Sequence, residues 1–271
     1  MQISVIISTY NAVAWLEKVL WGYNNQIFRD FEMVIADDGS GPETKQLIDT
    51  MSKQVFYPIK HIWQEDEGFQ KSRILNKAIM ACAADYILMS DGDCIPRKDF
   101  LQVHEDNKEP GYFISGGYFK LPMNISEMII KEDIFSEDCF NRTWMEERGL
   151  KKSFKNNKLT TTKAKAKFLN KITTTNSTWN GHNSSGWQKD IIQINGFDER
   201  MQYGGEDREL GERLMNVGIK GKQFRYSAIC LHLDHKRGYK TLESIQKNLD
   251  IRADVKKNKV TYTPFGIVKK N

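Results

Sequence analysis

The stretch YILMSDGDCIP, from Tyr86 to Pro96, joins a short apolar run to a pair of carboxylates. The run is rich in strand formers, so we expect a buried strand that ends at Ser90. Asp91 and Asp93 then stand one residue apart. Two carboxylates this close are costly unless a cation neutralises them, although a D-x-D pair is more often a solvated turn. The rest of the chain must decide between a metal-bound phosphate site and a simple turn.

A regular alternation of strand and helix patterns leads up to this stretch. Apolar runs begin at Ile3, Phe31 and His61, and amphipathic helical patterns lie between them. Alternation of this kind predicts a parallel sheet with right-handed crossovers. The expected fold class is therefore α/β, with a mostly parallel central sheet flanked by helices.

Polar loops follow three of the expected strands. Their sequences are S-T-Y-N after the first strand, D-D-G-S after the second and S-D-G-D after the fourth. Because the carboxyl ends of parallel strands share one edge of the sheet, these loops are expected to form one site. The expected helix caps are Asn11 for the first helix and Ser40 with Glu43 for the second.

The composition is that of an ordinary soluble protein. The 271 residues are 39% hydrophobic and 28% charged, with a net charge of +5, which suits anionic ligands without indicating nucleic acid. The four cysteines lack C-x-x-C spacing, and no apolar run approaches the ~20 residues of a membrane span. A strand pattern begins directly after the first residues, where a signal peptide would lie. We therefore expect reduced thiols and a cytoplasmic protein.

The expected site lacks a phosphate-binding glycine loop. No G-x-G-x-x-G follows the first strand, and no G-x-x-x-x-G-K-[ST] occurs. Phosphates would then be neutralised by a metal or by side chains near the third helix. We interpret Lys71 as a solvated helix charge and Arg73 as the cationic contact.

The second half begins with a strand pattern at 112–118 and an amphipathic helical pattern over 125–149. Residues 151–171 then carry eight lysines and no acidic residue. This segment predicts a mobile solvated loop, an acceptor-side lid, or a patch that meets an anionic glycan or membrane surface.

Several polar and aromatic residues further along suit sugar recognition. The stretch TWNGHNSSGW (residues 178–187) offers aromatic rings for stacking and amides for hydroxyl groups, although Trp179 and Trp187 could equally be core residues. Gly205 permits close backbone approach, and acidic residues at the following helix start would also be explained by the helix dipole. After a strand at 227–231, His232 and His235 have a spacing that suits a metal when an unpaired D-x-D is present.

Taken together, four motifs resemble those of the family 2 glycosyltransferases of the GT-A fold. They are VIISTYN (Val5–Asn11), DDGS (Asp37–Ser40), the D-G-D of Asp91–Asp93 and GGED (Gly204–Asp207). The distal half also resembles the catalytic core of β-1,4-galactosyltransferases and of chondroitin polymerases, through N-G-F at 195–197, GGED and C-x-H-x-x-H at 230–235. The resemblance covers about residues 3–120 and 177–240.

The resemblance implies inverting transfer of a hexose or N-acetylhexosamine from a UDP-sugar, with Mn²⁺ or Mg²⁺. Asp207 falls on the catalytic base. His235 falls on a metal ligand, and His232 stands where the galactosyltransferases carry a methionine ligand. The implied site comprises Ser8, Tyr10, Asp38, Arg73 and Asp91 for the donor nucleotide, Asp93, His235 and His232 for the metal, and Trp187, Gly205 and Glu206 for the acceptor sugar.

One catalytic domain is expected over residues 1–240, with a nucleotide-sugar half at 1–110 and an acceptor half at 111–240. A helix and basic tail would follow at 241–271. The implied acceptor is a glycan or glycolipid of a bacterial surface polysaccharide, reached from the cytoplasm with peripheral contact at an anionic inner membrane. Two alternatives stay open: an inactive sugar- or nucleotide-binding domain, and a sugar-phosphate nucleotidyltransferase.

Overall fold

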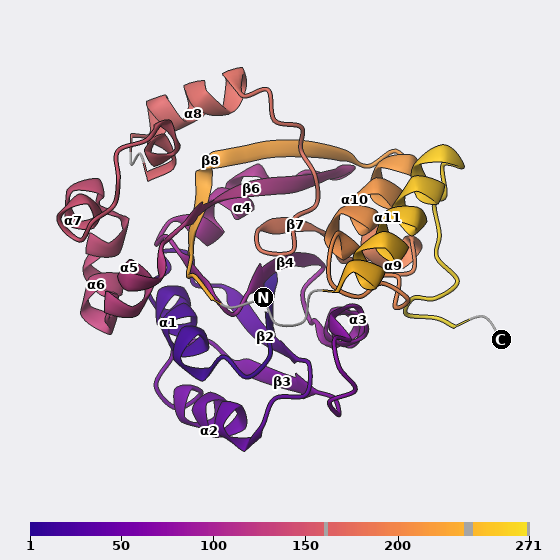
Figure 1. Ribbon diagram of the computed structural model, residues 1–271, viewed down its shortest axis with the longest axis horizontal. Helices are drawn as coiled ribbons and strands as arrows, with labels where there is room; N and C mark the ends of the chain where they lie inside the picture. The colour runs from indigo at the N-terminus through magenta and orange to yellow at the C-terminus, as the bar shows by residue number, and fades with distance from the viewer. Residues whose placement is uncertain (160–161, 236–240, 270–271) are drawn as a thin grey trace.

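The computed structural model describes residues 1–159, 162–235 and 241–269, and its centre is one eight-stranded sheet (Figure 1). The strand order is β3-β2-β1-β4-β7-β6-β8-β5. Strands β1 to β4, β6 and β8 run in one direction, and β5 and β7 run opposite to them. The predicted α/β class with a mostly parallel sheet is confirmed. The strands are β1 (Ile3–Thr9), β2 (Phe31–Asp37), β3 (Ile59–Trp63), β4 (Tyr86–Asp91), β5 (Cys94–Pro96), β6 (Tyr112–Lys120), β7 (Ser184–Trp187) and β8 (Lys220–His232).

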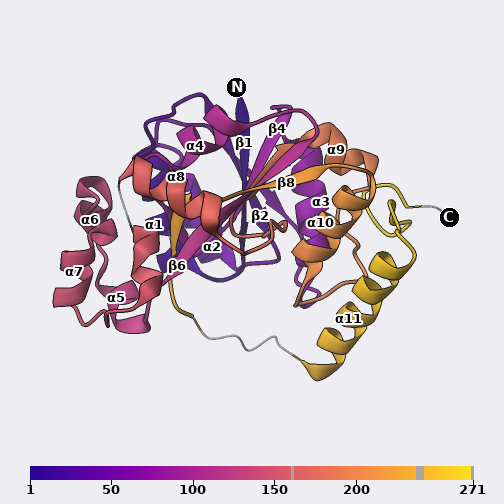
Figure 2. The same ribbon diagram turned by 90° about the horizontal axis from the view of Figure 1, so that it is seen from above.

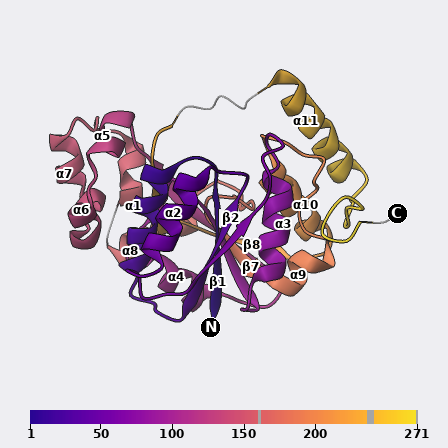
Figure 3. The ribbon, with the colours of Figure 1, turned by 90° about the horizontal axis from the view of Figure 1, so that it is seen from below.

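Helices cover both faces of this sheet. In Figure 3, α1 and α2 lie on one side and α3, α9 and α10 on the other. Two apolar clusters fill the spaces between sheet and helices, because β1, β2 and β4 are buried on both faces. The bounds are α1 (Val13–Asn24), α2 (Pro42–Met51), α3 (Lys71–Ala81), α4 (Phe100–Asn107), α9 (Gln188–Gln193) and α10 (Glu206–Asn216).

Neither expected helix cap forms. Helix α1 starts at Val13, and Asn11 adopts a positive φ of 46° while its Oδ1 accepts a hydrogen bond from Gly41 N (2.9 Å). Ser40 Oγ accepts a bond from Asn11 N (2.9 Å) and therefore does not cap α2. These two hydrogen bonds connect the loop after β1 to the loop after β2 and so fix the position of one loop relative to the other.

The helical pattern expected over 125–149 is present, but it is broken into short pieces. The chain forms α5 (Met123–Met128), α6 (Lys131–Ser136), the 3₁₀ turn η1 (Asp138–Phe140) and α7 (Arg142–Glu147). Figure 2 shows this group beside α1. The loop expected at 151–171 instead contains the 3₁₀ segment η2 (Phe154–Leu159) and α8 (Lys163–Ile172), which lies on the outer side of β8 (Figure 1).

The C-terminal segment packs against the body of the molecule. Helix α11 (Leu242–Lys257) lies beside α10 (Figure 3). Asn195 then binds the tail, because its Nδ2 donates to the carbonyls of Thr263 (2.7 Å) and Val268 (2.8 Å) and its Oδ1 accepts from Val268 N (2.8 Å). The division at residue 240 stays a prediction.

Candidate active site

Asp91, at the end of β4, is held from two sides. Ser8 Oγ donates a hydrogen bond to its Oδ1 (2.7 Å), and Lys71 Nζ lies 2.7 Å from the same oxygen. Gly92 follows, and its N–H donates to the carbonyl of Ser8 (2.8 Å). A Cβ at Gly92 would lie 3.1 Å from that carbonyl oxygen. The glycine between the two acids therefore lets the turn sit tightly against the end of β1.

Lys71 is a partly buried cation among carboxylates, so its interpretation as a solvated helix charge is wrong. Its side chain is 20% exposed. Burial acts to lower the pKa of Lys71, but Asp91, Glu206 and Asp207 outweigh it and raise that pKa above its ordinary value. Burial opposes the charge of Asp91 as well, yet Lys71 keeps the pKa of that carboxyl well below its usual range.

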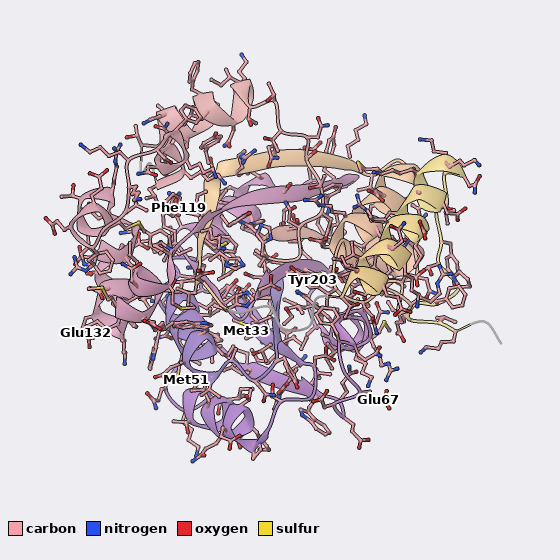
Figure 4. All side chains as sticks on the ribbon, in the orientation of Figure 1. Met33, Met51, Glu67, Phe119, Glu132 and Tyr203 are labelled. Atoms are coloured by element: carbon pink, nitrogen blue, oxygen red, sulfur yellow. The ribbon has the colours of Figure 1, made fainter. Side chains whose placement is uncertain are left out.

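Arg73, the cation expected from the sequence, does not join this cluster. Its Nη1 bonds Glu67 Oε2 (2.6 Å), and Glu67 lies at the outer rim of the molecule (Figure 4). A second carboxylate, that of Glu199, lies 4.0 Å from Arg73 Nε. The side chains at 71 and 73 point in different directions because they are two positions apart on one helix.

Asp38, directly after β2, is buried among polar groups. It accepts hydrogen bonds from Gln64 Nε2 (2.7 Å) and from Gln70 N (2.9 Å), and its burial raises its pKa. Gln64 is 5% exposed, and its Oε1 has no hydrogen-bond partner among the described residues. Sequence reasoning missed Gln64. Tyr10, in the loop after β1, is 48% exposed, and its hydroxyl donates to Asp66 (2.8 Å).

Asp93 and two histidines form a cluster suited to a metal. His235 Nε2 lies 3.0 Å from Asp93 Oδ2, and His232 Nε2 lies 3.8 Å from it. The two imidazole rings are stacked, with centroids 5.7 Å apart. His232 Nδ1 lies 2.8 Å from the carbonyl oxygen of Leu233, which can only accept, so Nδ1 carries the proton. The lone pair of His232 is then on Nε2, the nitrogen nearer Asp93, as in histidines that ligate metals.

Strand pairing brings these distant residues together. Cys94 of β5 pairs with His232 of β8, and Leu233 N donates to the carbonyl of Asp93 (2.8 Å). Ligand atoms of Asp93, Cys94 and His232 lie within 4.8 Å of one another. A carboxylate with two imidazoles fits Mn²⁺ better than the thiol does, whereas Mg²⁺ prefers oxygen ligands. The donor set therefore fits the cation that the sequence implied.

Two acidic residues open α10 on the other side of Lys71. Asp207 Oδ2 accepts a hydrogen bond from Gly181 N (3.0 Å), and Asp207 is partly exposed. Glu206 is only 9% exposed, and its Oε2 accepts from Gly204 N (2.9 Å). Burial, with the charge of Asp207, raises the pKa of Glu206 to about 7. This burial argues against the direct contact with acceptor hydroxyls that the sequence led us to expect.

Gly205 precedes this pair with φ +90°, a left-handed conformation that favours glycine. A Cβ there would come 3.1 Å from the side chain of Arg252 on α11. Glycine is thus required at position 205 by the turn into α10 and by the packing of Arg252. No contact with a ligand is needed to explain it.

His182 lies in the site; the sequence drew attention to the stretch 178–187 around it, but not to this histidine. Its ring lies edge-to-face with Tyr118 (4.5 Å between centroids), and Tyr118 also packs against His232 (5.8 Å). The His182 carbonyl accepts a bond from Ser90 Oγ (2.9 Å). Burial lowers the pKa of His182, against the attraction of Asp91 and other nearby acids. Only the register of β7 beside β4 reveals this placement.

Trp187 does not lie in the site, so its assignment to the acceptor sugar is wrong. Strand β7 runs antiparallel to β4, which pairs Trp187 with Tyr86 at the edge opposite Asp91. The Trp187 ring packs edge-to-face on Tyr86 (5.2 Å), and its Nε1 donates to the carbonyl of Glu109 (3.0 Å). Trp179 is fully buried against Phe113 and is a core residue.

Two family models match the chain. The model "Glycosyl transferase family 2" matches residues 4–163, and "N-terminal domain of galactosyltransferase" matches residues 166–236. The first covers the loops with Asp38, Asp91 and Asp93. The second covers Asp207 and both histidines.

Curated relatives share modest identity with most of the chain. Chondroitin synthase of Escherichia coli is 24% identical over 238 residues, which are 80% of this chain and 32% of the relative. Validoxylamine A glucosyltransferase of Streptomyces hygroscopicus subsp. jinggangensis is 26% identical over 226 residues, 80% of this chain and 52% of the relative. The chain thus spans about a third to a half of the length of these relatives.

Solved structures share the fold. The mannosyltransferase PcManGT from Pyrobaculum calidifontis, in complex with GDP-Man and Mn²⁺, gives a TM-score of 0.58 at 17% identity, over 88% of this chain and 58% of that chain. TarS 1-349 from S. aureus, in complex with UDP-GlcNAc, gives 0.59 at 15% identity, over 88% and 60%. Both support the GT-A architecture expected from the motifs. Among the helices that the structure describes, none has the length and hydropathy to cross a membrane.

Proposed function

The chain belongs to glycosyltransferase family 2, and we propose that it transfers a hexose or N-acetylhexosamine from a UDP-sugar to a hydroxyl of a glycan, with inversion. The resemblance noted in the sequence is thereby confirmed, while the donor, the metal and the residue roles are proposals. One observation carries them: Asp93, His232 and His235 converge next to Asp91 in the chain, and Lys71 pairs with Asp91 close enough to the acids of α10 for their charges to raise its pKa.

The uridine would bind at the polar ends of β1 and β2. Asp38 and Gln64 are hydrogen-bonded to each other there, and Tyr10 in the loop after β1 offers an exposed ring for stacking. Gln64 Oε1 is an acceptor with no hydrogen-bond partner among the described residues, and the N3–H of a uracil would satisfy it once the side chain turns toward the ligand. Ser8 and Asp91 would then stand next to the ribose.

The diphosphate would lie over Asp93 and the two histidines. Mn²⁺ or Mg²⁺ bound by these residues would neutralise the charge that builds on the leaving nucleoside diphosphate. His232 is suited to the role because its Nδ1–H is held by the Leu233 carbonyl. Lys71 adds a fixed positive charge on the Asp91 side, where it keeps Asp91 ionised.

Asp207 would remove the proton of the acceptor hydroxyl as that oxygen attacks the anomeric carbon. The Gly181 N–H fixes the position of Asp207 Oδ2. Glu206 would help to hold Asp207 in position. It is buried, and its Oε2 accepts a hydrogen bond from Gly204 N. A glycan or glycolipid in bacterial surface polysaccharide synthesis is the acceptor class we propose, with the enzyme on the cytoplasmic side of the membrane.

The test is release of UDP from a panel of UDP-sugars, with Mn²⁺ and with a chelator. Asp207→Asn should lower kcat by about 10² or more, and Asp93→Asn should also weaken donor binding. Asp85→Asn, an exposed acid near the opposite end of β4, is the control and should behave as wild type.

The alternatives give distinct results in the same assay. A binding domain without catalysis would bind UDP-sugar and release no UDP. A nucleotidyltransferase would form pyrophosphate instead. Retention of near-normal transfer in Asp207→Asn would reject the assignment of the base.

A further inference from the structure

Helix α8 has two apolar sides, and only one of them is covered. Ala166 and Leu169 face inward and pack with Tyr226 of β8. Ala164, Phe168 and Ile172 are spaced four residues apart, so they share the side that faces away from β8. Phe168 is 60% exposed and Ile172 is 54% exposed. A helix packed on one side thus presents a second apolar ridge to solvent.

Lysines surround this ridge. Residues 151–171 contain eight lysines and no acidic residue. Lys158 turns inward, where it donates to the carbonyl of Tyr118 (2.9 Å), and burial lowers its pKa to about 8. The other seven are exposed, and Phe154 of η2 is 76% exposed among them. We call the exposed set the basic face; it comprises Lys151, Lys152, Phe154, Lys155, Lys163, Ala164, Lys165, Lys167, Phe168, Lys171 and Ile172.

We propose that the basic face docks the protein onto an anionic phospholipid bilayer. Lysines near such a surface are attracted by its negative potential, and Phe154, Phe168 and Ile172 would enter the headgroup layer. The exposed apolar side chains favour a bilayer over a soluble polyanion as the partner. A soluble polyanion would pair with the lysines and leave the two phenylalanines in water, whereas a bilayer takes up both kinds of group.

The inward-facing Lys158 belongs to the same segment, η2, as Phe154 of the basic face, and it connects that segment to the proposed active site through Tyr118. Lys158 Nζ lies 4.9 Å from the centre of the Tyr118 ring, and that ring packs against His182 and His232. Docking would therefore hold the site close to the bilayer, which suits an acceptor sugar carried on a membrane lipid. This conclusion about the acceptor rests on the proposed function, while the docking itself does not.

Vesicle co-sedimentation tests the docking. The full chain should bind vesicles that contain about 30% phosphatidylglycerol in phosphatidylcholine, and binding should weaken as salt rises from about 0.05 to 0.3 M. The triple variant Lys165→Glu, Lys167→Glu, Lys171→Glu should bind at least tenfold more weakly. Its control carries the same charge change at the exposed lysines Lys53, Lys247 and Lys257, and should lose far less.

A second variant tests the apolar ridge at constant charge. Phe168→Ser with Ile172→Ser should weaken binding to the same vesicles about threefold or more, and far-UV circular dichroism reports whether the fold is intact. Equal binding to neutral and anionic vesicles would overturn the proposal. So would an apolar variant that binds as wild type, because the basic face would then be a site for polyanions.

The docking proposal and the proposed function can be rejected independently of each other. UDP release measured without vesicles should be unchanged in both variants, because no residue they alter is one of the proposed site residues. Loss of vesicle binding with intact UDP release would sustain the docking assignment. An inactive wild-type chain that still binds vesicles would reject the proposed function alone.

Discussion

Replacing Lys71 by methionine tests whether the positive charge of Lys71 stabilises the folded protein. Methionine keeps much of the length and removes the charge, which leaves Asp91 without its ion pair. Removing one partner of a fully buried pair costs about 3–5 kcal/mol, whereas an exposed pair contributes about 0–1 kcal/mol. The side chains of Lys71 and Asp91 are 20% and 23% exposed, and Ser8 still donates to Asp91. We therefore expect a loss of about 2–3 kcal/mol in the free energy of unfolding.

Urea unfolding followed by tryptophan fluorescence measures this loss, with a chelator present so that metal binding does not contribute. Lys45→Met is the matched control, because Lys45 pairs with Asp49 on the surface, 65% and 57% exposed. It should cost only about 0.5 kcal/mol. The double variant Lys71→Met, Asp91→Asn removes the unpaired charge and should recover about half of the loss.

Two results would refute this reasoning. A Lys71→Met variant no less stable than the Lys45→Met control would mean that Lys71 is solvated after all. A double variant as unstable as Lys71→Met would mean that the loss comes from packing and not from an uncompensated Asp91 carboxylate.

Three further predictions follow from the site geometry. The folded protein keeps a proton on Glu206 up to about pH 7 that the unfolded chain releases near pH 4, so stability should fall as pH rises between these values. In Glu206→Gln, urea titrations from about pH 5 to pH 8 should lack this fall, which we expect to be on the order of 2 kcal/mol; an unchanged pH profile would contradict it. His232→Ala and His235→Ala should each weaken Mn²⁺ binding, measured by calorimetry, by about 10- to 100-fold. If the His232→Ala variant bound Mn²⁺ as tightly as wild type, His232 would not be a metal ligand. Trp187→Phe should keep wild-type KM for every acceptor, since the ring lies at the far edge of the sheet, and a raised KM would reopen its assignment.

Local sequence patterns were sufficient for the first half of the fold. Apolar β-branched runs of strand length alternate with helical patterns, and this order dictates a parallel sheet with its polar loops on one edge. Asp38, Asp91 and Asp93 could be placed in this way, because each lies at the end of a strand or within two residues of it. The same reasoning failed for the side chains at 71 and 73, since a helical periodicity does not say which charge is buried.

The second half of the site depends on pairings between segments far apart in the chain. His232 meets Asp93 because β5 pairs with β8, and β7 enters antiparallel to β4, which brings His182 into the site and carries Trp187 away. The sequence alone determined which strands end in carboxylates, because strand length and polarity are local properties. Only the tertiary structure decided which distant side chains face those carboxylates, because strand direction and register are set by packing across the whole sheet.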